Sequence, residues 1–195
     1  MDDQFAEPVF TLAEEMLNQW SKQILEAWIG NFAKLLPILA KSKNGLRETH
    51  YVNKGINMVQ KMSQRAETLT VRTCCALLIG AIADQNSLLS VSTFNSSVLP
   101  TVKNICQDFN WEVRKEVCGQ LPFIAKYMGK DESWEHIYPE LQELLDDEER
   151  EVVSTAIQAF TALVEEYLSP PDPENNAATS APVNEIEVVR ARLNA

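Results

Sequence analysis

The residues of this 195-residue sequence best suited to bind a metal ion are four cysteines and two histidines. They are Cys74, Cys75, Cys106, Cys118, His50 and His136. None of them has the CxxC or paired spacing that chelates zinc. The carboxylates of 146–151 have no histidine, glycine-rich phosphate loop or nucleophile motif beside them, so they do not form a catalytic acid and base. The sequence therefore predicts a protein that is not an enzyme and has no metal or cofactor.

A second group of residues is suited to protein binding. Segment 108–112 reads Asp-Phe-Asn-Trp-Glu and places two aromatic residues beside a predicted turn, with Lys115 close by. An exposed tryptophan near a basic residue is typical of a binding hot spot. The alternative is that Trp111 folds down against the start of the following helix as a hydrophobic staple. The acids of 146–151 likewise either meet a basic partner or complement the positive end of the next helix.

Charge and hydropathy narrow the range of partners. The net charge of −11, from 17 basic and 28 acidic residues, argues against nucleic acid, because phosphate binding needs lysine and arginine. Apolar stretches such as 74–83 are shorter than the roughly 20 residues that cross a bilayer, and the first residues are acidic, unlike a secretion signal. We therefore expect protein partners, no nucleic acid, no membrane, and a cytoplasmic or nuclear location where thiols stay reduced.

The elements that position these residues form a repeat. Segment 98–124 recurs at 137–163 with a shift of 39 residues, and segment 71–82 matches 113–124 with a shift of 42. A further shift of 43 places Leu36-Pro37 opposite Ile79-Gly80. The apolar positions are three and four residues apart, which is the spacing of an amphipathic helix. A period near 40 residues predicts a solenoid of helical hairpins.

We expect four antiparallel helix pairs, namely 7–18 with 22–41, 48–63 with 67–83, 97–107 with 111–128, and 134–145 with 150–168. Pro100 and Pro139 are expected in first helical turns, and Pro37 and Pro122 are expected to kink second helices. Gly129 is expected to end a helix. The expected interior residues are Leu99, Val102, Ile105, Val113, Val117, Leu121, Ile124, Leu141, Leu144, Val152, Ala156, Phe160 and Leu163.

The composition changes after Leu168. Residues 169–184 are rich in proline and lack bulky apolar side chains other than Val183, which predicts a flexible linker. Residues 185–195 follow Asn184, an N-cap candidate, and carry Ile186, Val189 and Leu193 at helical spacing. The predicted organisation is an all-α solenoid over 1–168, a linker over 169–184, and a short terminal helix over 185–195.

The two clearest units resemble the HEAT repeat. One runs from Leu99-Pro100 through Asp108 to Val113-Arg114, and the other from Tyr138-Pro139 through Asp147 to Val152. Segment 98–118 is similar to the repeats of the phosphatase 4 regulatory subunit 4 family and, more distantly, to type 2A phosphatase scaffold subunits. In that family a turn aspartate and the Val-Arg arginine form a ladder between neighbouring repeats.

The resemblance implies specific roles for residues of this sequence. Arg72, Asp108, Arg114 and Asp147 match the ladder, whereas Val153 replaces the next arginine and the turn at 64–67 lacks an aspartate. The implied function is a non-catalytic scaffold or regulatory subunit that binds a serine/threonine phosphatase catalytic subunit through its intra-repeat turns. The expected binding residues are Arg65, Phe109, Asn110, Trp111 and Lys115. The alternative is a HEAT adaptor for transport or cytoskeletal partners, since solenoids serve many functions.

Overall fold

The computed structural model describes residues 3–19, 22–40, 46–64, 69–84 and 89–168, and all regular secondary structure in these ranges is α-helical. The helices are α1 (Asp3–Gln19), α2 (Lys22–Ala40), α3 (Leu46–Ser63), α4 (Leu69–Asp84), α5 (Val91–Ser97), α6 (Leu99–Cys106), α7 (Trp111–Met128), α8 (Lys130–His136), α9 (Tyr138–Leu145) and α10 (Arg150–Leu168). The predicted all-α solenoid is confirmed. Residues 169–195, with the predicted linker and terminal helix, lie outside the described residues.

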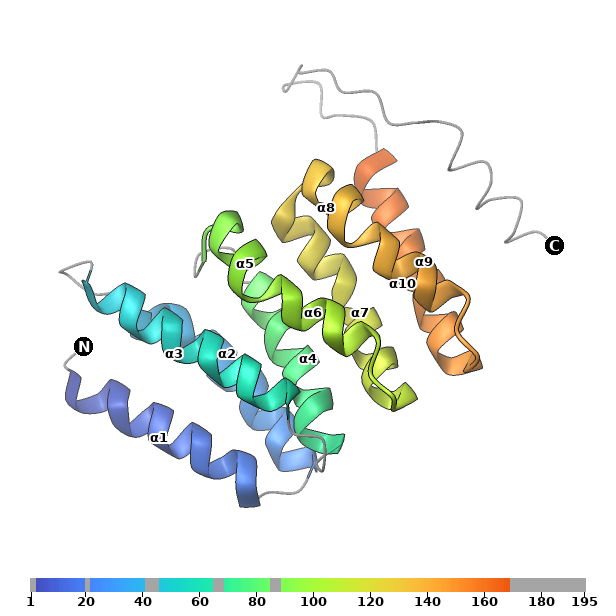
Figure 1. Ribbon diagram of the computed structural model, residues 1–195. Coiled ribbons are helices and arrows are strands. Elements are labelled where there is room, and N and C mark those ends of the chain that lie inside the picture. Colours follow the sequence, from blue (N-terminus) through green and yellow to red (C-terminus); the bar gives the residue numbers. More distant parts are fainter. Residues whose placement is uncertain (1–2, 20–21, 41–45, 65–68, 85–88, 169–195) are drawn as a thin grey trace.

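The helices are arranged in two layers (Figure 1). One layer consists of α2, α4, α7 and α10 in chain order, and the other consists of α1, α3, α6 and α9. Each hairpin pairs one helix from each layer, and the most extensive contacts between hairpins join α4 to α7 and α7 to α10. An isolated hairpin leaves one apolar face exposed, so stacking on a neighbour is what buries it.

The first helices of the third and fourth hairpins differ from the prediction. Single helices were expected at 97–107 and 134–145. Helices α6 and α9 lie within these ranges, but each is preceded by a further short helix, α5 or α8, which meets it at Val98 or Ile137. Each junction lies two residues before a proline, Pro100 or Pro139, in the first turn of the second piece. Proline has no N–H, so one backbone hydrogen bond of a continuous helix is missing at each junction.

The extra helix α5 has a local signal that the repeat comparison missed. The side chain of Ser90 caps it, with Oγ accepting a hydrogen bond from the N–H of Thr93 at 3.1 Å. Gly129 ends α7 as expected, with a φ of 85° that favours glycine. Helices α2 and α7 extend past Pro37 and Pro122, and the kinks expected there remain predictions.

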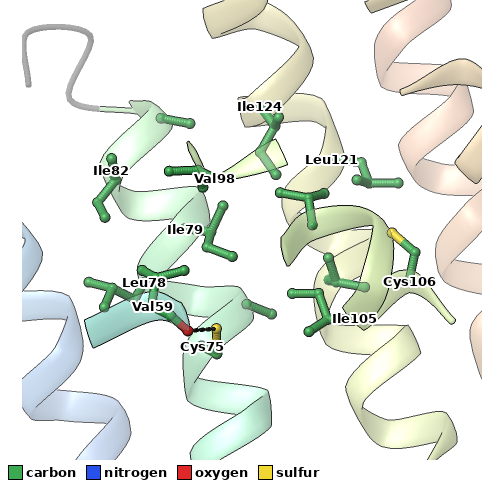
Figure 2. Packing of buried hydrophobic residues seen from close by; sticks show 14 of the residues in the cluster. Val59, Cys75, Leu78, Ile79, Ile82, Val98, Ile105, Cys106, Leu121 and Ile124 are labelled. Carbon is green, nitrogen blue, oxygen red and sulfur yellow. Dashed lines mark hydrogen bonds between the residues drawn. The ribbon is translucent and has the colours of Figure 1, made fainter. Parts of the chain in front are cut away.

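The core runs along the stack and contains all 13 residues that the sequence placed inside. Leu121, Ile124 and Val117 of α7 are fully buried, as are Val152 and Ala156 of α10. Figure 2 shows how side chains of α4 face those of α6 and α7 across the junction between the second and third hairpins. The helical spacing read from the sequence therefore identified the buried stripe correctly.

Helices α4 and α7 approach each other closely at Gly80. A Cβ added to Gly80 would lie only 2.9 Å from the Cβ of Gln120, which is shorter than real Cβ contacts. The absence of a side chain at this position lets the two helices pack as they do, so any larger residue would push α7 away from α4.

Candidate protein-binding ridge

Two inter-helix turns with the same construction lie along one edge of the stack, in neighbouring hairpins (Figure 1). One joins α6 to α7 and the other joins α9 to α10 (Figure 1). We call residues 107–115 and 146–151, which are these turns and the helix starts that follow them, the turn ridge. In each turn an aspartate accepts a hydrogen bond from the N–H two residues further on. Asp108 Oδ1 accepts from Asn110 N, and Asp147 Oδ1 accepts from Glu149 N, both at 2.9 Å.

The first turn is tied to the preceding hairpin by a buried ion pair. Arg72 of α4 donates through Nε to Asp108 Oδ2 at 2.7 Å and through Nη2 to Asp108 Oδ1 at 3.2 Å. The two side chains are only 3% and 8% exposed. A two-bond contact of this kind fixes both the distance and the orientation of the groups, so the turn is held rigidly against α4.

The second turn is tied to the third hairpin in the same way. Arg114 of α7 donates to Asp147 Oδ2 through Nε at 2.7 Å and to Oδ1 through Nη2 at 2.8 Å. Its remaining Nη1 donates to the backbone oxygen of Asp108 at 2.9 Å, so one guanidinium joins both turns. The hydrogen bonds from Arg114 lower the pKa of Asp147, and the same contact raises the pKa of Arg114.

The pattern changes on α10, where the corresponding residue is Val153. An aliphatic side chain cannot donate a hydrogen bond to a further aspartate. The two ion pairs described here therefore join the second hairpin to the third and the third to the fourth.

Phe109 is the aromatic residue that protrudes from the ridge. Its side chain is 77% exposed, and its ring lies 4.5 Å from the guanidinium carbon of Arg72 in a cation–π contact. The neighbours on each side, Asp108 and Asn110, use their side chains to fix the turn. Phe109 thus occupies the central position of a rigid turn and projects toward solvent.

Trp111 adopts the staple arrangement, one of the two alternatives that the sequence left open. It is half-buried and packs against the core. It is the first residue of α7, where folding down covers apolar surface at the helix start. Phe109 is the more exposed of the two expected aromatic residues, and the sequence signal for this was its position between two residues with turn-forming side chains.

The other expected binding residues have different surroundings. Asn110 is the N-cap of α7, and its Oδ1 accepts a hydrogen bond from Glu112 N at 2.9 Å. Lys115 is 42% exposed, forms an ion pair with Glu151 at 2.7 Å, and its Nζ lies 5.9 Å from the Trp111 ring. The hydrogen bond from Lys115 lowers the pKa of Glu151. Arg65 lies outside the described residues.

A family model, "PIK3R4-like, middle domain", matches residues 7–171. The chain belongs to this family. The match covers all four hairpins and the turn ridge, so the residues described above are part of the PIK3R4-like middle domain.

Two curated relatives of this PIK3R4-like domain carry the same name, "Serine/threonine-protein phosphatase 4 regulatory subunit 4". The human protein is 26% identical over 160 residues, covering 82% of this chain and 17% of the relative. The mouse protein is 28% identical over 166 residues, covering 85% of this chain and 16% of the relative. The resemblance seen in segment 98–118 is confirmed. The chain spans about one sixth of the length of these relatives, which by name are regulatory subunits.

The buried cysteines of the PIK3R4-like domain are poor nucleophiles. All four are buried, and burial raises the pKa of Cys106 and of Cys75, and raises that of Cys118 to about 12. A nucleophilic cysteine needs a lowered pKa and access to substrate. Across the described residues, no three His, Cys, Asp or Glu side chains cluster as metal ligands would. No helix in the same ranges has the length and hydropathy of a membrane span.

Proposed function

We propose that this PIK3R4-like domain is a non-catalytic regulatory or scaffold module that binds a serine/threonine phosphatase catalytic subunit through the turn ridge. The observation that carries the proposal is Phe109, a large apolar side chain that is 77% exposed on a turn held by buried ion pairs. Ordering a flexible loop on binding costs free energy, and a preformed turn avoids that cost. The names of the two relatives point to phosphatase 4 as the partner.

The surface around Phe109 has the composition of an interface centre with a charged rim. Aromatic residues are enriched at the centre of protein interfaces, and charged residues surround them. The Lys115–Glu151 ion pair belongs to the same ridge as Phe109, and both of its side chains are substantially exposed. The acids at 146–151 complete a rim whose charge favours a partner with basic groups opposite them.

The experiment is a calorimetric titration of the purified chain with a phosphatase 4 catalytic subunit. Phe109→Ala should weaken binding by about 30-fold, corresponding to about 2 kcal/mol, if Phe109 is a hot spot. Phe123→Ala is the matched control, because Phe123 is also an exposed phenylalanine, at 45%, but lies in α7 away from the turns. Its affinity should equal that of the unsubstituted chain.

Two results would refute the proposal. Failure of the unsubstituted chain to bind the catalytic subunit removes the phosphatase partner. Equal affinity for Phe109→Ala and the unsubstituted chain removes the ridge as the binding surface. Trp111→Ala is a less useful variant, because removing a ring that packs against the core changes stability as well as the surface. Four buried cysteines that form no disulfide fit a reducing compartment, and we propose the cytoplasm or nucleus as the location.

A further inference from the structure

The repeat shift shows which residues of each second helix are covered by the following hairpin. In α4 and α7 these positions are filled by equivalent residues that are buried or nearly so: Arg72, Ala76 and Ala83 in α4, and Arg114, Cys118 and Ala125 in α7. Shifting the α7 set by 39 residues gives Val153, Ile157 and Val164 of α10. All three are aliphatic and only half-buried. We call these three residues the end face.

The end face is the lateral side of the last described helix of the stack, at the opposite end from α1 (Figure 1). Its first and last residues, Val153 and Val164, are 11 residues apart, or about 16 Å at 1.5 Å per residue. The position that holds an arginine in α4 and α7 holds Val153 here, so this face lacks the group that binds the turn aspartate of another HEAT unit. Its chemistry suits an apolar helix, and an uncovered apolar end makes a solenoid prone to associate.

The sequence of residues 185–195 has the complementary pattern. Ile186, Val189 and Leu193 are spaced by three and four residues, which places them on one side of a helix. Glu185, Glu187 and Arg192 would occupy the remaining sides. A helix with its apolar side on the end face would therefore present charged residues to solvent, as a terminal cap requires.

The linker is long enough to allow this contact. Residues 169–184 can extend to roughly 50 Å, whereas α10, with its 19 residues, is about 28 Å long. The terminal segment can therefore reach every part of the end face. Because it is tethered, its effective concentration is of millimolar order, so a small apolar contact is enough to hold it.

Charge selects the direction of the segment. Four exposed acids lie at or just before the start of α10, namely Asp146, Glu148, Glu149 and Glu151. The basic residues of the segment, Arg190 and Arg192, lie toward its C-terminal end. An antiparallel arrangement brings the arginines next to the acids, whereas a parallel arrangement separates them.

We propose that residues 185–195 form a helix that docks antiparallel to α10 on the end face formed by Val153, Ile157 and Val164, and so covers this face. This proposal does not depend on the phosphatase partner, because the end face itself contains no residue of the turn ridge; the acids of 146–151 affect only the direction of the docked segment. The occupant is this chain's own terminal segment, joined through the linker.

Paramagnetic labelling in the full-length chain tests the contact. All four native cysteines are buried, so an Asn194→Cys substitution provides one accessible thiol for a nitroxide label. The docked segment should cause loss of the methyl NMR signals of Ile157 and Val164, and most strongly of Val153, relative to the reduced, diamagnetic sample. The methyl signal of Ile24, in α2 near the other end of the stack, should keep its intensity.

A pair of neighbouring valines supplies the matched control. Val189→Asp places a charge on the apolar side of the segment and should restore the end-face signals. Val188→Asp introduces the same charge on a different side and should leave the broadening intact. Circular dichroism confirms that each variant retains its helical content. On the end face itself, Ile157→Asp should abolish the broadening at Val153. Gln158→Asp, at an exposed neighbouring position of α10, should not.

Two outcomes would overturn the proposal. Unchanged end-face signals in the labelled chain would show that the segment does not dock there. A sample that mixes spin-labelled chains with separate isotope-labelled chains identifies the second outcome. In this mixture only a contact between two molecules can broaden the end-face signals. If they broaden as strongly as the proportion of spin-labelled chains predicts, the end face is occupied by a second copy. Broadening that disappears in the mixture supports docking within one chain.

Discussion

The hairpins of this domain are joined in two different ways. From the second hairpin onward, buried two-bond ion pairs, Arg72–Asp108 and Arg114–Asp147, connect each hairpin to the next. Between the first and second hairpins, the described residues include two ion pairs from α1 to α3, Lys54–Glu7 and Lys61–Glu14. The side chains of Lys61 and Glu14 are 67% and 58% exposed.

The difference shows where geometry is fixed by polar contacts and where it is fixed by apolar packing. A guanidinium that bonds a carboxylate at two points tolerates little rotation of one hairpin against the next. An exposed lysine pair constrains little and contributes about 0 to 1 kcal/mol. The first junction depends instead on the packing of α2 against α4. Inside the first hairpin, Phe10 lies edge-on to Phe32 at 5.4 Å and Trp28 stacks on Phe32 at 4.7 Å.

The largest expected effect comes from breaking a buried ion pair. Arg72→Met keeps the volume of the side chain but leaves the carboxylate of Asp108 buried without its charged partner. We expect the free energy of unfolding, measured by urea denaturation, to decrease by about 3 to 5 kcal/mol. Adding Asp108→Asn to Arg72→Met should recover part of the loss. A loss below about 1 kcal/mol would show that Asp108 is solvated and that the pair does not hold the hairpins together.

The second prediction compares a core residue of the third hairpin with a surface residue of the first. Leu121 is fully buried in α7, so Leu121→Ala should cost about 2 to 5 kcal/mol through lost burial and the cavity left behind. Leu12→Ala in α1 is the matched control, because Leu12 is 49% exposed and should cost about 0.5 kcal/mol or less. Thermal melting measures both, and equal shifts would contradict the difference between the two regions.

The sequence predicted the fold well in the region joined by the ion pairs. Val113, Val117 and Leu121 recur with a constant shift because each must fill the same place in successive hairpins, and all are buried. Identical packing problems produce identical spacing, which is visible in a single sequence. The first hairpin matches the repeat least clearly because its two helices, α1 and α2, pack together through aromatic residues that the other hairpins do not have at those positions.

The details of the candidate site were less predictable. Whether Phe109 or Trp111 is the exposed aromatic residue depends on which side chain the turn directs outward. The hydrogen bonds of Asp108 and Asn110 set this direction. The break at Val98 depends on Pro100 together with a capping serine that the repeat pattern does not contain. Residue type indicates what a group can do, whereas the backbone decides where it points.

The third prediction uses pH to separate the two kinds of ion pair. The pKa of Asp147 is lowered in the folded state by hydrogen bonds from Arg114. A lowered pKa contributes stability above the ordinary value of 3.8, and this stability is lost as the pH falls through the folded-state pKa. Arg114→Met removes that contribution, so its unfolding free energy should decrease less between pH 5 and the acid limit than that of the unsubstituted chain. If the unfolding free energies of Arg114→Met and the unsubstituted chain have parallel pH profiles, the prediction is wrong.

The smallest expected effect tests the surface pair at the first junction. Lys61 and Glu14 lie 3.0 Å apart with both side chains more than half exposed. Water solvates both charges in the folded and unfolded states, and ordering two long side chains costs entropy that offsets most of the attraction. Lys61→Ala should therefore change the unfolding free energy by at most about 1 kcal/mol, and the effect should shrink further in high salt. Denaturation at low and high ionic strength measures it. A loss as large as that of Arg72→Met would mean that the first junction also depends on an ionic contact, and the distinction between the two kinds of junction would be wrong.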